Sequence, residues 1–321
     1  MNKFNNEVEA ANALHEKFHA LKTEINKVIV GQDEVIELVL SSIFCHAHSL
    51  LVGVPGLAKT LLIKTVSEAM NLDFNRIQFT PDLMPSDILG AETLDKDRNF
   101  KFIKGPIFNN IILADEINRT PPKTQAALLE AMQEKNVTVA GAAYTLPNPF
   151  FVLATQNPIE QEGTYPLPEA QLDRFMFNIT LDYPSYKEEI NIVKQSPMQA
   201  NAKVEAVIDA SEISYFQELI DQVPVTDNVV EYAVKLVHST RPNGEFSQEI
   251  TNNYLEWGAG PRASQFLIKA AKCHALLNGK YSPDIEDVRA VAIPILRHRL
   301  IKNFKADAEG LTIEDIIGKL L

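Results

Sequence analysis

The pattern of apolar and polar positions changes along the chain, from a mixture of strands and helices to helices alone. Five short apolar or alternating runs predict strands, with helical spacing between them: residues 49–52, 74–79, 110–114, 150–154 and 175–179. After Pro184 strand signals fade, and amphipathic helices are expected at 186–195, 211–221, 226–240, 262–277 and 284–298. The pattern therefore predicts an α/β domain over residues 1–195 and a helical domain over 196–321, with the boundary at a turn near 195–197.

Further elements flank the predicted strands. Helices are expected over residues 7–30 and from about Asp33, before the first strand. Two hairpins are expected, one within residues 92–103 and one within 137–146. A helix is predicted over residues 121–133, with Thr120 as its cap and two prolines in its first turn.

Composition narrows the class of protein. A chain of 321 residues with 45% hydrophobic residues can bury a core in each of two domains. Its net charge of −12 argues against a surface adapted to nucleic acid, because phosphate backbones attract clustered lysine and arginine. Cys45 and Cys273 both lie in apolar contexts and indicate a reducing compartment. With neither a signal peptide nor a membrane span in the pattern, we expect a cytoplasmic protein.

A glycine-containing loop follows the first predicted strand and predicts a polyphosphate site. Its backbone N–H groups can surround phosphates at a helix N-terminus, Lys59 can reach the β- and γ-phosphates, and the Thr60 hydroxyl can hold Mg²⁺. Ala58 stands where such loops commonly have a last glycine. The residues expected to contact ATP here are Gly53, Val54, Pro55, Gly56, Leu57, Ala58, Lys59, Thr60 and Leu61.

Polar side chains at the ends of two later strands complete the predicted chemistry. Asp115 ends the apolar run 111–114 and is expected to orient Mg²⁺ beside the nucleotide, while Glu116 can polarise the attacking water. Asn157 follows the strand at 150–154, where its amide can contact the γ-phosphate; taken alone, Asn157 and the proline after it would also suit a simple turn.

These motifs, together with the segments 172–175 (Leu-Asp-Arg-Phe) and 258–262 (Gly-Ala-Gly-Pro-Arg), resemble MoxR-type AAA+ ATPases over about residues 25–300. The resemblance implies a five-stranded parallel sheet of order 5-1-4-3-2, a helical lid, and the two hairpins as the helix-2 and pre-sensor insertions. It implies Asp115 and Glu116 as the Walker B pair and Asn157 as sensor 1.

The resemblance also assigns residues around the nucleotide. It implies Arg174 as an arginine finger that serves the neighbouring subunit, and Arg262 as a sensor 2 that folds over its own subunit's nucleotide. Val30 and Gly31 resemble the turn that contacts adenine, although a simple turn between helices is the alternative. The basic run Arg297, His298 and Arg299 is expected to be a solvated helix face.

The function implied by the resemblance is ATP hydrolysis by a homo-oligomeric ring, with a hexamer expected, that remodels protein clients. A partner with a von Willebrand factor A domain is implied, and ATP and Mg²⁺ are the implied cofactors. A metal-chelatase motor subunit and a nucleic-acid motor are alternatives, the second disfavoured by the negative charge. A nucleotide-gated binding module with little turnover would have no need for both Glu116 and Arg174.

Overall fold

The computed structural model describes residues 4, 6–94, 96–97, 99–159, 163–194 and 203–321. The chain divides into two compact units. The sheet unit comprises His19–Pro168 and Ile179–Ser214, and the helical unit comprises Met1–Phe18, Glu169–Asn178 and Tyr215–Leu321. The boundary predicted near residues 195–197 lies outside the described residues. The two units are interleaved in sequence, so they do not coincide with a single cut after residue 195.

The sheet unit is built on five strands: β1 (Ser49–Gly53), β2 (Phe74–Gln78), β5 (Ile111–Asp115), β8 (Phe151–Gln156) and β9 (Phe177–Leu181), the last of which crosses between the units. Their order in the sheet is β2-β5-β8-β1-β9. Numbered along the chain, this is the order 5-1-4-3-2, and the predicted sheet is confirmed. The pairs β2–β5, β5–β8 and β8–β1 are parallel, so their carboxyl ends lie along one edge.

Helices supply the connections that parallel strands require. Between strands of the sheet lie α3 (Lys59–Ala69), α4 (Pro85–Leu89), a 3₁₀ turn η1 (Ile117–Arg119) and α5 (Pro122–Glu134). Two helices precede the first strand, α1 (Glu7–Asn26), which begins in the helical unit, and α2 (Asp33–Phe44), while α7 (Tyr186–Lys194) follows the last strand. The first helix ends at Asn26, earlier than predicted: tighter turn bonds follow at Lys27 and Val28, and the positive φ of Gly31 and Gln32 then leads the chain into α2. The predicted Thr120 cap is wrong: Pro121 occupies the N-cap position of α5 and makes no side-chain cap.

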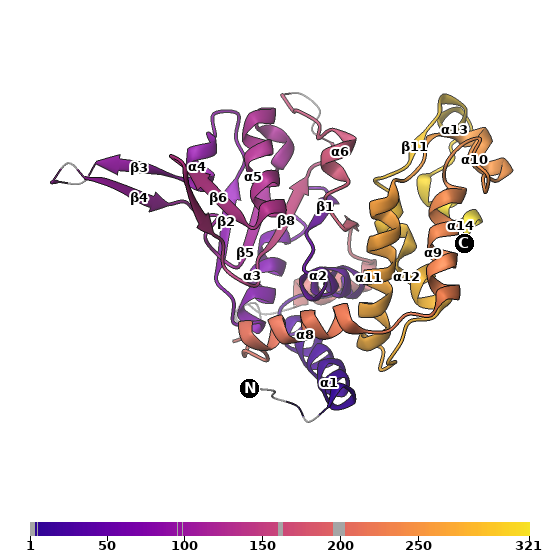
Figure 1. Ribbon diagram of the computed structural model, residues 1–321, viewed down its shortest axis with the longest axis horizontal. Coiled ribbons are helices and arrows are strands. Elements are labelled where there is room, and N and C mark those ends of the chain that lie inside the picture. Colours follow the sequence, from indigo (N-terminus) through magenta and orange to yellow (C-terminus); the bar gives the residue numbers. More distant parts are fainter. Residues whose placement is uncertain (1–3, 5, 95, 98, 160–162, 195–202) are drawn as a thin grey trace. The chain divides into compact units, whose positions relative to one another are not determined.

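Both predicted hairpins are present. They are β3 (Gly90–Leu94) with β4 (Phe100–Lys104), and β6 (Asn136–Val139) with β7 (Ala142–Thr145), each antiparallel. The β3–β4 hairpin extends away from the five-stranded sheet (Figure 1). The rings of Phe102 and Tyr144 stack with centroids 4.1 Å apart, so the two insertions contact each other.

The helical unit contains the remaining elements. They are α6 (Glu169–Leu172), α8 (Ala210–Gln222), which begins in the sheet unit, α9 (Asp227–Ser239), α10 (Glu249–Tyr254), α11 (Pro261–Leu277), α12 (Ile285–Leu296), α13 (Phe304–Ala308) and α14 (Ile313–Leu320). A short antiparallel pair, β10 (Leu255–Trp257) with β11 (Ile301–Lys302), was not predicted. Within the described part of the chain, no helix has both the length and the apolar character that crossing a membrane requires.

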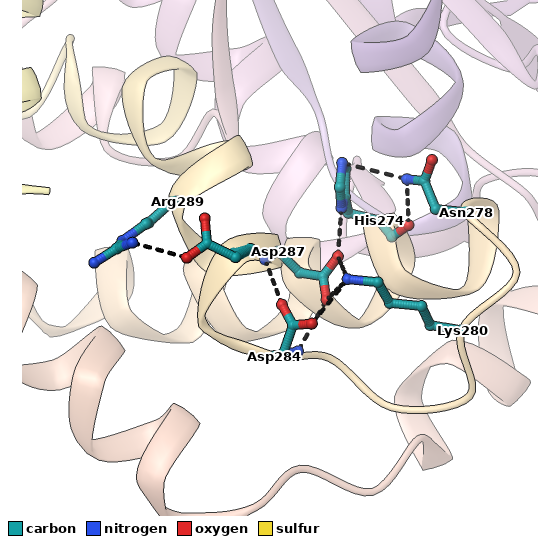
Figure 2. Close-up of polar contacts among 7 residues, drawn as sticks. His274, Asn278, Lys280, Asp284, Asp287 and Arg289 are labelled. Atoms are coloured by element: carbon teal, nitrogen blue, oxygen red, sulfur yellow. Dashed lines mark hydrogen bonds and ion pairs between the residues drawn. The ribbon is translucent and has the colours of Figure 1, made fainter.

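A buried carboxylate joins α11 to α12 within the helical unit (Figure 2). Asp287 is fully buried and lies 2.7 Å from His274 Nδ1 and 3.0 Å from Lys280 Nζ. Asp287 also accepts the backbone N–H of Asp284, and Asp284 in turn caps α12 by accepting the N–H of Asp287. These bonds satisfy a charge whose burial would otherwise be costly, and they fix the start of α12 against the end of α11.

The sheet unit contains a histidine that is buried in its neutral form. The Val152 N–H donates to His48 Nδ1 over 3.0 Å, and His48 Nε2 lies 3.1 Å from the Met132 carbonyl, to which it donates. Nδ1 must lack a proton to accept the first bond. Burial lowers the pKa of His48 from its ordinary value of 6.5 to about 4.

This lowered pKa predicts a loss of stability in acid. Between pH 6.5 and about 4 the unfolded state binds a proton at His48 that the folded state does not bind, so stability falls as the pH decreases. The full loss from this group is about 3 kcal/mol. Urea unfolding across this range should show a shallower pH slope for His48→Gln than for wild type. Identical slopes would contradict the assignment.

Candidate nucleotide-binding site

The loop between β1 and α3 depends on its glycines for its shape. A Cβ on Gly53 would lie 2.8 Å from Leu181 Cβ and from the Leu181 carbonyl, so the closeness of β9 demands glycine. Gly56 has φ +87°, and Ala58 is left-handed at φ 56° directly before α3. Ala58 therefore takes a conformation that favours glycine, which accounts for the glycine common at this position.

Lys59 is the first residue of α3, and its side chain turns back over the loop. Its Nζ donates to the carbonyl of Gly53, across the concave face of the loop. Burial lowers the pKa of Lys59, while the negative charges of Asp115 and Glu116 oppose that shift. A half-buried cation is thus held where a polyphosphate would be neutralised.

Asp115 ends β5 with both carboxylate oxygens in hydrogen bonds. Its Oδ1 accepts from the Thr155 hydroxyl at 2.6 Å. Its Oδ2 accepts from Arg76 Nη2 at 2.6 Å and Nε at 3.0 Å. Thr155 is fully buried on β8 and also accepts the backbone N–H of Glu116 at 2.9 Å, so one hydroxyl fixes both acids relative to the neighbouring strand.

Glu116 lies on a sharp turn after β5. Its backbone is left-handed at φ 58°, and its carboxylate has other donors than that of Asp115. Gln78 Nε2 at 2.8 Å and Arg119 Nη1 at 3.0 Å both donate to the same oxygen, Oε2. The carboxylate is oriented by one neutral and one charged donor.

Asn157 follows β8 and is buried, with its Oδ1 accepting the backbone N–H of Ile159 at 3.1 Å. This bond is of the kind found in Asn turns. Asn157 therefore forms a turn and also lies at the site, so the two interpretations of the sequence are compatible. The amide nitrogen remains available as a donor on the same side chain.

These groups surround one cavity of about 490 Å³ in the sheet unit. It is lined by Pro55, Gly56, Leu57, Ala58, Lys59, Thr60, Leu61, Arg76, Asp115, Glu116 and Asn157. Most of the residues predicted to contact the nucleotide therefore lie around a single space. Gly53 and Val54 precede the lining and shape the loop.

Val30 and Gly31 lie elsewhere in the sheet unit, in the turn between α1 and α2. Gly31 has φ +70°, and a Cβ there would lie 2.5 Å from the Glu188 carboxylate. The turn therefore requires glycine both for its backbone and for the closeness of α7.

Arg174 and Arg262 belong to the helical unit. Arg262 Nη1 donates to Asp173 Oδ2 at 3.1 Å, so it is bound to the residue directly before Arg174. Arg299 donates to the other oxygen of Asp173 at 2.8 Å. The expectation that residues 297–299 form a solvated face is wrong, because the Arg299 side chain is only 2% exposed and is neutralised by Asp173.

Three residues of the site were missed by the sequence analysis: Arg76, Gln78 and Thr155. The register pairs Gln78 with Asp115, and Arg76 lies two residues earlier on the same face of β2. Thr155 follows Ala154, which pairs with Ala114 beside the acids. The available signal was the convergence of parallel strand ends, which places polar residues at the last positions of β2 and β8 next to the end of β5.

Comparison with known proteins agrees with this geometry. The family described as "ATPase family associated with various cellular activities (AAA)" matches residues 48–177, and the "AAA lid domain" matches residues 247–320. The chain is 41% identical to the chaperone MoxR1 of Mycobacterium tuberculosis, over 97% of this chain and 83% of that protein. It is also 41% identical to the uncharacterized protein YeaC of Bacillus subtilis, over 96% of this chain and 94% of YeaC.

A solved structure resembles the whole fold. A protein from Cytophaga hutchinsonii that was assigned as an ATPase superimposes with a TM-score of 0.91 at 44% sequence identity, covering 97% of this chain and 95% of that one. Both the family matches and these similarities extend over the sheet-bearing part and the helical part of the chain. The chain belongs to the MoxR family of AAA+ ATPases.

Proposed function

We propose that this protein binds ATP in the cavity beside Lys59 and hydrolyses it. The observation that carries the proposal is the convergence of a half-buried lysine, two oriented carboxylates and a buried asparagine on one space at the strand ends. A binding module would need the loop, but it would not need a second carboxylate held by two donors of its own.

The residues fit Mg²⁺ as well as phosphate. Thr60 and Asp115 offer hydroxyl and carboxylate oxygens, which Mg²⁺ prefers, and both line the cavity. When bound, the ion would neutralise charge on the phosphates. Lys59 would contact the β- and γ-phosphates, and the loop N–H groups would enclose the chain of phosphates.

Glu116 is the proposed general base, with Asn157 beside the γ-phosphate. Gln78 and Arg119 hold one carboxylate oxygen, which orients the group toward an attacking water. We propose that Arg174 completes the site of a neighbouring subunit, and that Val30 and Gly31 contact the adenine.

We further propose that the protein acts as a homo-oligomeric ring, a hexamer, on protein clients in the cytoplasm, with a von Willebrand factor A domain protein as partner. The name of the relative MoxR1, a chaperone, supports a protein client. A chelatase-type motor remains the alternative; a nucleic-acid motor is disfavoured by the net charge of −12. ATPase rates measured with nucleic acid or with an A-domain protein distinguish these functions.

Lys59→Ala should lose nucleotide affinity by about 10-fold or more, because a charge-assisted contact to the phosphates disappears. Isothermal titration with ATP and Mg²⁺ measures this. Lys64→Ala is the matched control, since Lys64 is an exposed lysine on the same helix that pairs with Glu68. Equal affinities for Lys59→Ala and wild type would rule out the loop assignment.

Glu116→Gln should bind ATP but hydrolyse it about 10²-fold more slowly, because the amide cannot accept the proton of water. Phosphate release under saturating ATP gives the rate. Glu68→Gln, the same change on an exposed face, should match wild type. Hydrolysis by Glu116→Gln at the wild-type rate would show that another group is the base. Because this variant should stay bound to ATP, it also suits affinity capture of clients.

Mixing variants tests whether Arg174 acts across subunits. Arg174→Ala subunits still bind ATP and Lys59→Ala subunits still carry Arg174, so the mixture should recover hydrolysis that neither variant shows alone. An arginine supplied in trans can contribute about 10³-fold in rate. Absence of recovery in verified mixed oligomers would contradict a trans role.

A mixture of Arg262→Ala subunits with Lys59→Ala subunits tests which subunit's nucleotide Arg262 serves. The resemblance implies action on its own subunit's nucleotide, and then no recovery is expected. Recovery equal to that of the Arg174→Ala mixture would contradict this own-subunit role of Arg262.

A further inference from the structure

The segment that carries Arg174 is bound on several sides by one buried side chain, that of Arg299. Arg299 Nε donates to Asp173 Oδ1 at 2.8 Å. Its Nη2 donates to the carbonyls of Asp173 at 2.9 Å and Phe175 at 2.6 Å. Its Nη1 lies 3.2 Å from the Met176 carbonyl. Three of the four residues from 173 to 176 are thus bound to a single guanidinium, and Arg174 is the fourth.

Arg299 itself is held firmly by the helical unit. Its Nη1 also donates to the carbonyl of Ile295, one turn earlier at the end of α12, and its guanidinium lies 5.1 Å from the ring centroid of Phe266 on α11. The neighbouring His298 places Nε2 3.0 Å from the same Phe175 carbonyl. His298 and Arg299, two consecutive residues after α12, therefore fix the backbone on both sides of Arg174.

The chemistry of this contact suits arginine alone. A guanidinium presents five N–H donors in a rigid planar fork, whereas a lysine ammonium presents three at one point. Burial lowers the pKa of Arg299 to about 10, so it stays protonated at neutral pH beside Asp173. Arg262 binds the second oxygen of the same carboxylate, which leaves the Asp173 side chain little freedom to rotate.

We propose that Arg299 is a positioning residue for Arg174: it fixes the segment at residues 173–176 to the C-terminal helices, so that Arg174 reaches a neighbouring subunit's nucleotide in a defined orientation. The inference rests on the proposed role of Arg174 in hydrolysis. Because residues 169–178 and the C-terminal helices form one compact unit, any movement of that unit carries Arg174 with it. The helical unit thereby controls the neighbour's hydrolysis through Arg299.

The test is a double-mutant cycle on the full-length assembly. Arg299→Lys should lower kcat by about 10- to 100-fold, as expected when a catalytic group is displaced by about 1 Å, with ATP affinity unchanged. In an Arg174→Ala background, Arg299→Lys should cause no further loss, because the group it positions is absent. A mixture of Arg299→Lys with Lys59→Ala subunits should recover hydrolysis.

Two controls separate positioning from a general loss of stability. Asp287→Asn weakens another buried ionic contact of the same unit (Figure 2), in the first turn of α12, whereas Arg299 follows the end of that helix; it should lower the melting temperature without lowering kcat. The second control is the far-UV circular dichroism of Arg299→Lys, which should match that of wild type when the helices of this unit are intact. Should Arg299→Lys fail to fold, Asp173→Asn, which weakens the same clamp, takes its place.

The outcomes are distinct. A further, multiplicative loss in the Arg174→Ala background, a loss of ATP affinity, or wild-type kcat in a folded Arg299→Lys variant would each overturn the positioning role. Wild-type kcat for Arg174→Ala would instead show that the finger assignment itself is wrong, whatever Arg299 does.

Discussion

The parallel alignment of β1, β5 and β8 is the constraint on which the candidate site depends. Parallel strands bring all their carboxyl ends to one edge, and three chain segments distant in sequence end there: the loop before Lys59, the acids after β5 and Asn157 after β8. These strands are buried on both faces, so a slip of one residue would move a polar residue from the strand end, such as Asp115, into the apolar interior. Hydrophobic burial thus determines which polar side chains meet, and one hydroxyl, that of Thr155, fixes both acids.

What the sequence predicts well here is what depends on periodicity and on local motifs. The runs at 49–52 and 111–114 are apolar and short, and each leads directly into its functional group, so Lys59, Asp115 and Glu116 could be placed before the fold was known. Arg76 and Gln78 could not, because their role comes from the pairing of β2 with β5, and pairing is a tertiary property. The Thr120 cap failed for a local reason: Pro121 fits the N-cap backbone and takes that position.

Arg299 was wrongly predicted to be solvated, because the local composition around it is basic. Two arginines around a histidine after an amphipathic helix have the pattern of a solvated face, and nothing in the local sequence indicates that the third of these residues is buried. Its counter-charge, Asp173, lies 126 positions earlier in the chain. Burying an arginine costs much free energy unless a carboxylate neutralises it and its N–H groups have acceptors. Because these partners are distant in sequence, the periodicity of the local sequence cannot predict the burial.

Each charged group around the cavity has a protein partner before any nucleotide is considered. Lys59 donates to the Gly53 carbonyl, Asp115 pairs with Arg76, and Glu116 pairs with Arg119. The side chains of Arg76 and Arg119 are 46% and 43% exposed, so water can solvate them if they are displaced. Exchange of these partners for phosphate and metal therefore costs little, because half-exposed ion pairs contribute only about 0–1 kcal/mol each. The Thr155 contacts are buried and resist exchange, so the acids keep their orientation while their exposed partners change.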